Sequence, residues 1–135
     1  MILYINTSDE EKVALALGKA GKLIAKREFK AKYRQSEKLL PAIDLLLAKN
    51  KIKLSDLLGV VAVNGPGPFT ATRIGVTVAN ALAYGLNIKI AGLRADEFDN
   101  IEDMVSRGWE KLSKAKKEKT VEPVYDREPN ITIKN

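Results

Sequence analysis

The stretch from Leu57 to Ile88 constrains the fold most, because it holds a single charged residue, Arg73, in a chain that is 30% charged. So long an uncharged run indicates burial. It divides into a β-branched run at 59–63, a glycine and proline loop at 65–70, and a periodic segment at 71–86. These patterns predict a strand, a tight turn and a helix, with Thr70 placed to cap the start of the helix.

The predicted helix at 71–86 differs from an ordinary surface helix, because no charged residue stands between Arg73 and Lys89. On a helical wheel its apolar side chains form one face, its small side chains form an adjoining face, and Thr77, Asn80 and Tyr84 remain as a polar strip. We expect the sheet to cover one face and a helix, of this chain or of another, to cover the other. The pattern leaves open which face meets which. If the small side chains face the sheet, the partner is expected to meet the strip of Thr77, Asn80 and Tyr84. It equally allows the central helix of a three-layer sandwich, covered by its own chain.

Composition narrows the possible functions. The 135 residues predict one domain, and the absence of Cys and His excludes disulfides, thiolate zinc sites, Ser-His-Asp triads and histidine metal clusters. The start of the chain lacks the pattern of a secretion signal, and the uncharged run is short for a membrane span, so we expect a cytoplasmic protein without membrane contact. The net charge of +6 permits contact with nucleic acid. We interpret the Lys and Arg residues at 19–38 as a solvated sheet edge, with RNA contact as the alternative.

The remaining patterns place strands and helices in a defined order. Runs at 2–7, 12–17 and 23–30 predict three strands of a meander, and 36–50 predicts a helix with an apolar stripe. A strand follows at 89–93, then a helix at 95–117 interrupted by Gly108, a short strand at 123–127 and a loose end at 129–135. This order predicts an α/β fold, a ribonuclease-H-like or actin-like ATPase (ASKHA) half-domain. Its mixed five-stranded sheet would carry helices on both faces, with parallel strands after the first crossover helix.

Three motifs in this order resemble a known family. They are ILYINTS at the start, RQSEKLLPAIDLLL at 34–47 and GPGPFTATRIGV at 65–76, and PVYDR at 123–127 looks like a closing motif of the same family. The chain thus resembles the TsaB (YeaZ) family, in a reduced single-lobe form. The resemblance implies an actin-like fold without catalysis of its own or a cofactor. It also implies pairing with a TsaD-like subunit and, with a TsaE-like ATPase, support for threonylcarbamoyl transfer to tRNA.

The resemblance also suggests which residues contact the partner. The family pairs through two helices that match 36–50 and 71–86 here, and the chain alone is allowed to form a homodimer on the same helices. Contact with tRNA would be indirect, through the complex. The expected partner-binding residues are Ser36, Glu37, Leu40, Ile43, Leu47, Thr72, Gly75, Val76, Ala79, Asn80 and Ala83. The expected structural loop residues are Gly65, Pro66, Gly67, Phe69, Thr70 and Arg73.

The chain departs from the family pattern in several places. Asn6 replaces the usual first-strand Asp, Pro68 and Ala71 replace a Ser and a Gly, and a His is missing between Gln35 and Ser36. Only a short segment at 99–122 stands where the family carries a second lobe. We therefore expect a lobe at 1–93 and, in place of the second lobe, a helix and tail at 94–135. Because a second lobe closes the nucleotide cleft in this superfamily, its replacement argues against ATP turnover.

Two classes of enzyme compete with the scaffold role. A ribonuclease-H-like nuclease needs strand-borne carboxylates that hold paired Mg²⁺, and an ATP-binding actin-like enzyme or a glycoprotease needs a phosphate loop or catalytic side chains. The first strand offers Asn6, the strand at 59–63 offers no carboxylate, and no GxxxxGK[ST] motif occurs. The sequence therefore favours a non-catalytic dimerisation or scaffold subunit, with no metal site.

Overall fold

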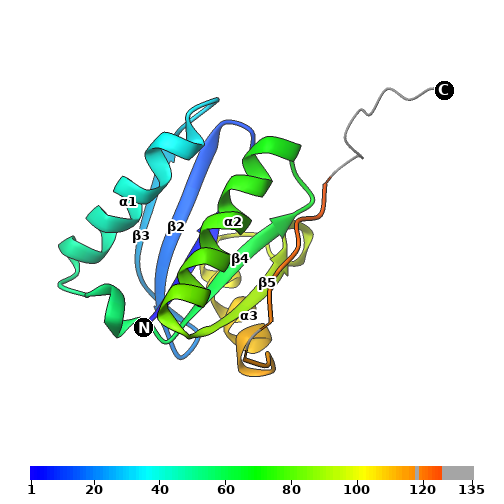
Figure 1. Ribbon diagram of the computed structural model, residues 1–135. Coiled ribbons are helices and arrows are strands. Elements are labelled where there is room, and N and C mark those ends of the chain that lie inside the picture. Colours follow the sequence, from blue (N-terminus) through cyan, green and yellow to red (C-terminus); the bar gives the residue numbers. More distant parts are fainter. Residues whose placement is uncertain (118, 126–135) are drawn as a thin grey trace.

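The computed structural model describes residues 1–117 and 119–125. Within these residues, three strands come first and are followed by three α-helices that alternate with two more strands, with two short 3₁₀ turns between them (Figure 1). In chain order they are β1 (Ile2–Asn6), β2 (Lys12–Lys19), β3 (Lys22–Lys30), α1 (Gln35–Lys49), η1 (Leu54–Asp56), β4 (Gly59–Gly65), α2 (Phe69–Leu86), β5 (Lys89–Arg94), η2 (Ala95–Glu97) and α3 (Ile101–Ser113).

The strands form one sheet in the order β3-β2-β1-β4-β5. The pairs β1–β2 and β2–β3 are antiparallel, whereas β1–β4 and β4–β5 are parallel. The predicted mixed sheet is therefore confirmed, because the chain turns back through hairpins first and through crossover helices afterwards. In the β2–β3 pair the register shifts between Leu17 and Gly18, which leaves Ile24 as an extra residue in β3.

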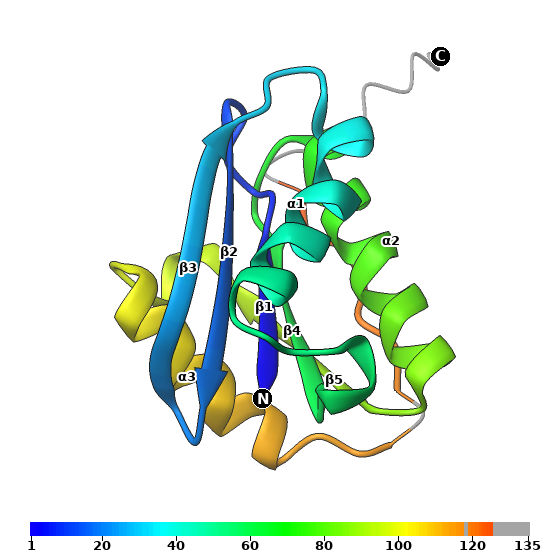
Figure 2. The same ribbon diagram turned by 90° about the vertical axis from the view of Figure 1, so that its left-hand side faces the viewer.

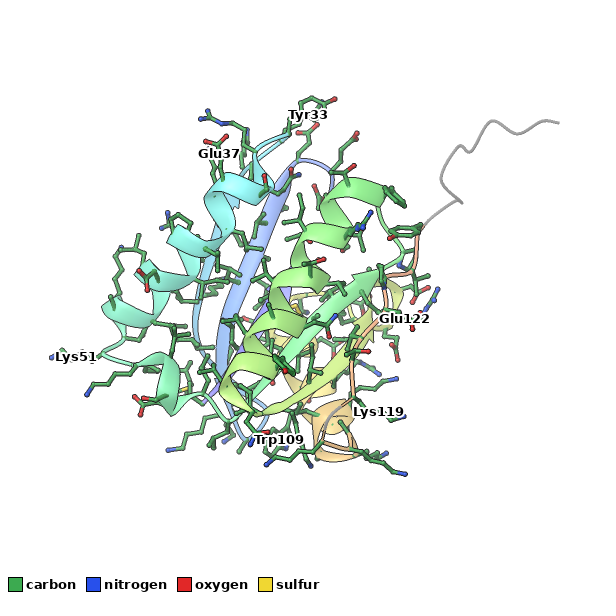
Figure 3. The ribbon with its side chains drawn as sticks, viewed as in Figure 1. Tyr33, Glu37, Lys51, Trp109, Lys119 and Glu122 are labelled. Atoms are coloured by element: carbon green, nitrogen blue, oxygen red, sulfur yellow. The ribbon has the colours of Figure 1, made fainter. Side chains whose placement is uncertain are left out.

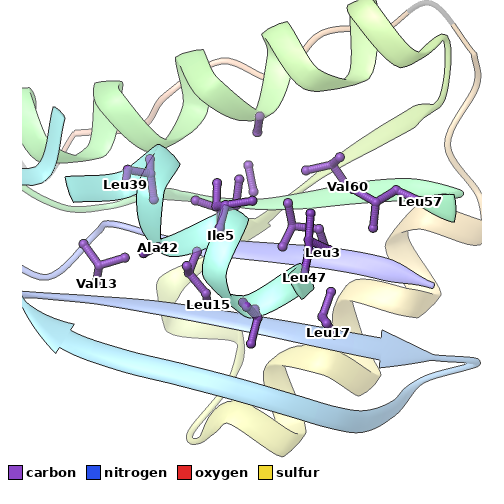
Figure 4. Close-up of a cluster of buried hydrophobic side chains, with 14 of the residues drawn as sticks. Leu3, Ile5, Val13, Leu15, Leu17, Leu39, Ala42, Leu47, Leu57 and Val60 are labelled. Carbon is purple, nitrogen blue, oxygen red and sulfur yellow. The ribbon is translucent and has the colours of Figure 1, made fainter. Parts of the chain in front are cut away.

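Helices cover both faces of this sheet, as predicted. Figure 2 shows α1 and α2 on one side of the strands and α3 on the other. The core beneath α1 joins Leu39 and Leu47 of that helix to Leu3, Ile5 and Leu15 of the sheet (Figure 4). These side chains are almost completely buried, so their apolar surface is removed from water and stabilises the layer.

The second core lies beneath α3. Met104, Val105 and Leu112 of α3 pack against a cluster that includes Tyr4 and Val61, and the Tyr4 hydroxyl donates a hydrogen bond to the Val105 carbonyl at 2.9 Å. Helix α3, in the predicted segment 94–135, therefore shares a core with the sheet. Its role as the replacement of a second lobe stays a prediction.

Helix α3 differs from the sequence pattern in two details. The helix predicted from residue 95 begins at Ile101, because the Asn100 side chain accepts a hydrogen bond from the Asp103 amide at 2.7 Å and caps it there. Gly108 does not interrupt α3 but lets it approach Tyr4, whose ring would meet a Cβ at 2.7 Å.

The predicted strand at 123–127 is reduced, within the described residues, to one bridge between Gly67 and Tyr125. The rest of that strand, and the end predicted at 129–135 to be loose, lie outside the described residues. None of the helices in the described part of the chain is both long and apolar enough to span a bilayer.

Candidate partner-binding surface

The loop between β4 and α2 fixes where α2 begins. Gly65 has φ +110°, and a Cβ there would clash with the carbonyl of Val124, so glycine is required at this position. The helix starts at Phe69 with Pro68 as its N-cap, and no side chain caps it. The expectation that Thr70 is the cap is therefore wrong, because Thr70 already lies within the first turn.

The small side chains of α2 face the sheet. Ala79 is 0% exposed, and a Cβ on Gly75 would collide with the Thr7 side chain of the β1–β2 turn. The Thr7 hydroxyl also donates a hydrogen bond to the Ala71 carbonyl at 2.6 Å. Of the two orientations that the pattern left open, the structure has the one in which Gly75, Ala79 and Ala83 lie inward.

The opposite side of α2, called here the outer α2 face, carries one charged residue, Arg73. Its exposed members are followed around the helix by the half-buried side chains Ile74, Val78 and Leu82. Tyr84, near the carboxyl end, is 91% exposed, and Leu40 of the adjacent helix α1 is 53% exposed. The exposed members of the outer α2 face are Thr70, Arg73, Thr77, Ala81 and Tyr84.

A groove lies between the amino ends of α1 and α2. It consists of two adjoining hollows of about 380 Å³ and 360 Å³, which share Ser36, Phe69, Thr70 and Ile74. Tyr33, at its rim, is 84% exposed, and Figure 3 shows it beside Glu37 at the outer end of α1. We call this feature the α1–α2 groove.

One ion pair lies at the amino end of α1, beside this groove. The Arg34 guanidinium and the Glu37 carboxylate approach to 3.2 Å, and their hydrogen bond lowers the pKa of Glu37 below its ordinary value. Both side chains are exposed, so this pair adds little to stability.

Comparison with known proteins gives the family. The family model described as TsaD: tRNA N6-adenosine threonylcarbamoyltransferase matches residues 29–119. The chain belongs to this family, as a TsaB (YeaZ) member.

Several TsaB and YeaZ proteins resemble the chain. The tRNA threonylcarbamoyladenosine biosynthesis protein TsaB of Bacillus subtilis is 35% identical over 96 residues, which cover 71% of this chain and 42% of that protein. The protein of the same name from Buchnera aphidicola (Schizaphis graminum) is 32% identical over 84% of this chain and 51% of the relative.

The solved structure of YeaZ from Pseudomonas aeruginosa superposes with a TM-score of 0.63 at 27% identity, covering 69% of this chain and 43% of that chain. The chain thus spans about half the length of the TsaB relatives it matches. The ribonuclease-H-like, actin-like fold is shown by the same likeness.

The structure separates the partner-binding residues that TsaB membership implied into three groups. Ser36, Glu37 and Leu40 are exposed on α1, and Asn80 is half-buried. The remaining seven are enclosed by the chain itself, because they lie on the sheet-facing sides of α1 and α2, so we correct the predicted surface by removing them. They are Ile43, Leu47, Thr72, Gly75, Val76, Ala79 and Ala83.

Residues of the outer α2 face were absent from that prediction. Thr77 and Tyr84 belong to the polar strip that the sequence predicts to meet the partner when the small side chains face the sheet, whereas the pattern places Ala81 with the apolar side chains. Their position on the wheel opposite Gly75 and Ala79 would have identified them, had the inward face been known. The sequence contained no local signal for Tyr33, which adopts a positive φ of 62°.

Asn6, which replaces the family's first-strand Asp, is hydrogen-bonded to Ser8. The Asn6 side-chain oxygen accepts hydrogen bonds from the Ser8 amide at 2.9 Å and from the Ser8 hydroxyl at 2.6 Å. Asn6 thereby holds the turn that leaves β1. Within residues 1–117 and 119–125, no three acidic side chains converge in a way that would hold a metal ion.

Proposed function

We propose that this chain is a non-catalytic scaffold subunit of the machinery that forms threonylcarbamoyladenosine in tRNA, and that it docks on a TsaD-like catalytic subunit. The names of its TsaB relatives support the process, and the outer α2 face supports the docking. A TsaE-like ATPase and tRNA would join through the complex, in the cytoplasm. Alone, the chain would form a homodimer on the same face.

The outer α2 face is the observation that carries this proposal. Cores of protein interfaces are depleted of charged residues, and this helix carries none from Ile74 to Ile88. Covering Ile74, Val78 and Leu82 would bury apolar surface without desolvating a charge. Arg73 and Tyr84, residue types common at binding hot spots, stand at its two ends.

Charge on the outer α2 face tests the docking. Ala81→Glu places a carboxylate at an exposed position of α2, so the monomer should stay folded while binding of the TsaD-like subunit from the same organism weakens at least tenfold. Ser106→Glu, the matched control, adds the same charge at an exposed position of α3 and should bind as the wild type does. Titration calorimetry measures both affinities. Equal affinity of the two variants would contradict docking on this face.

The non-catalytic role has a separate test. The Asn6 side chain is engaged by Ser8, and the sequence offers no His or Cys for acid–base or nucleophilic chemistry. The isolated chain should therefore not hydrolyse ATP above the background rate. ATP turnover that disappears on Asn6→Ala would show that the chain is an enzyme, and RNA cleavage that requires Mg²⁺ would favour the nuclease alternative.

A further inference from the structure

The segment from Lys119 to Tyr125, called here the C-terminal strap, returns past the sheet after α3. Figure 1 shows it beside β5 and α2, and Figure 3 labels Lys119 and Glu122 along its path. In the middle of α2, the Asn80 amide donates a hydrogen bond to the Val121 carbonyl at 2.8 Å, and its oxygen accepts one from the Val121 amide at 2.9 Å. One side chain thus satisfies both backbone groups of Val121, as a neighbouring strand would.

A second set of contacts holds the strap at the end of β4. The Asn64 side-chain amide donates to the Glu122 carbonyl at 3.1 Å, and the Asn64 backbone carbonyl accepts from the Val124 amide. Space for the strap is provided by glycines. A Cβ on Gly65 would clash with the Val124 carbonyl, and a Cβ on Gly92 would lie 3.0 Å from the Val121 side chain. The sequence therefore accommodates the strap at several separate positions.

The far end of the strap reaches the residues of the α1–α2 groove. The Tyr125 ring lies 4.4 Å from the Phe69 ring, centroid to centroid, and the Arg73 guanidinium lies 5.9 Å from the Phe69 centroid. Phe69 in turn lines both hollows of the groove. A continuous set of contacts thus runs from the strap through Phe69 to the outer α2 face.

The start of α2 needs such support. A side-chain N-cap typically contributes about 1 kcal/mol to a helix, and α2 has none. Its first turn is held instead by distant groups, namely the hydrogen bond from Thr7 to Ala71 and the Tyr125 ring on Phe69. By contrast, α3 is capped locally by Asn100.

We propose that the C-terminal strap positions the partner surface, and that Asn80 is the residue that fastens it. The docked strap holds Phe69 and the first turns of α2 in the arrangement that forms the α1–α2 groove. Asn80 acts on the partner through the strap rather than by touching it. This inference rests on the proposed function only in taking that surface to be the one that the TsaD-like subunit contacts.

Hydrogen exchange, measured segment by segment on the full chain, tests directly whether the C-terminal strap supports α2. Asn80→Ala removes both bonds to Val121, and Tyr125→Ala removes the ring from Phe69. In each variant, amides at 121–125 and at 73–76 should exchange severalfold faster than in the wild type, and affinity for the TsaD-like subunit should fall severalfold. Tyr125→Phe keeps the ring and should restore both properties. Asn50→Ala is the matched control, because the side chain of that half-buried Asn, at the C-cap of α1, donates to the Leu46 carbonyl and, among the described residues, has no hydrogen bond to the strap.

Two results would overturn the inference. In one, amides at 121–125 exchange faster in Asn80→Ala and Tyr125→Ala while the amides of α2 and the partner affinity stay at wild-type values. In the other, Asn80→Ala leaves exchange at 121–125 unchanged, which would remove Asn80 from the fastening role. A wild-type chain that fails to bind the TsaD-like subunit contradicts the proposed function instead, and the exchange at 73–76 still decides whether the strap supports α2.

Discussion

The two helices α2 and α3 lie on opposite faces of one sheet, and their outer surfaces differ in polarity. On α3 most apolar residues face inward, although Trp109 is 36% exposed, and the outer surface carries charged residues, some of them in ion pairs. Arg107 contacts Asp103 at 3.1 Å, and Lys111 contacts Glu97 of η2 at 3.1 Å. On α2 the inward side chains are small, and the outer α2 face exposes apolar and uncharged groups.

This difference supports the proposal that a second protein surface covers α2, whereas α3 resembles an ordinary solvent-exposed helix. The outer side of α3 carries charged residues and its start is capped, as in an ordinary solvent-exposed helix, and its one partly exposed aromatic residue, Trp109, lies against Gly21 of the β2–β3 turn. The outer α2 face keeps the half-buried Ile74, Val78 and Leu82 in contact with water, although the chain has charged residues elsewhere in plenty. A second protein surface would bury these groups and account for their presence.

The largest expected effect contrasts the two sides of α2. Ala79→Glu puts a carboxylate without a partner between helix and sheet, which should cost about 3 to 5 kcal/mol and unfold much of the protein. Ala81→Glu, two residues away on the outer α2 face, should change the free energy of unfolding by less than about 0.5 kcal/mol. Thermal unfolding followed by circular dichroism compares them. Similar melting temperatures would mean that the inward side of α2 has been assigned wrongly.

A smaller effect uses two glycines of the same helix. Gly75→Ala forces a methyl group against Thr7 and should destabilise by about 1 to 3 kcal/mol, as overpacking does. At Gly85 a Cβ would have no atom within 4 Å, so Gly85→Ala should stabilise by up to about 1 kcal/mol through helix propensity. Urea unfolding gives both values. The opposite signs are the prediction, and a shared sign would contradict the close packing of α2 on Thr7.

On the α3 side of the sheet, Tyr4→Phe should lower the free energy of unfolding by about 1 kcal/mol. Tyr4→Phe removes the hydroxyl that bonds the Val105 carbonyl. Burial also raises the pKa of Tyr4 to about 12 from 10, so the neutral form is favoured in the folded state. Its stabilising contribution is present below pH 10 and is lost as pH rises from about 10 to 12.

The pH dependence itself distinguishes the two proteins. Urea unfolding between pH 9 and pH 12 should show a steeper loss of stability in the wild type than in Tyr4→Phe, which has no phenol at this position. Parallel curves would mean that Tyr4 is not the group that ties α3 to the sheet under alkaline conditions.

The smallest expected effect concerns the basic residues of β3 and the turn after it, outside both helices. Lys26, Arg27, Lys30, Lys32 and Arg34 should give this chain only weak, salt-sensitive affinity for RNA. Each phosphate contact steepens the fall of log affinity with log salt by about 0.9 for a duplex, so Lys26→Ala with Lys30→Ala should flatten a measured slope by at most about two.

Filter binding to tRNA at several salt concentrations measures that slope. Among the described residues, neither Lys26 nor Lys30 takes part in an ion pair, so the double variant should keep its stability. Tight tRNA binding by this chain alone at physiological salt would show that the charged strand, rather than α2, is its main binding surface.

Most of the fold could be predicted because its strands and helices are indicated by patterns of neighbouring residues. The alternation at 12–17 and the β-branched run at 59–63 each lie within a residue or two of the strand ends. Asn100 could have indicated the start of α3, since Asn is a favoured N-cap. The predicted helix begins too early because Phe98 continues the helical spacing of apolar residues. The glycine and proline loop located the turn but not the cap.

What could not be predicted depended on distant residues. A face of Gly75, Ala79 and Ala83 suits a close helix and a close sheet equally well, and the outcome was decided by Thr7, far away in sequence. For the same reason Asn80 looked available to a partner. Asn80 forms hydrogen bonds with Val121, and no residue pattern within α2 predicts them.

The extra residue Ile24 in β3 has a consequence for solubility. β3 is the outermost strand, and an outermost strand invites another chain to add itself and so to aggregate. Because the bulge bends and twists the strand at Ile24, the regular part of the edge is limited to the residues from Ala25 onward, where Lys26 and Lys30 repel a like strand. Addition of another chain at β3 is thereby disfavoured, so this edge is not expected to join copies of the protein into a larger sheet.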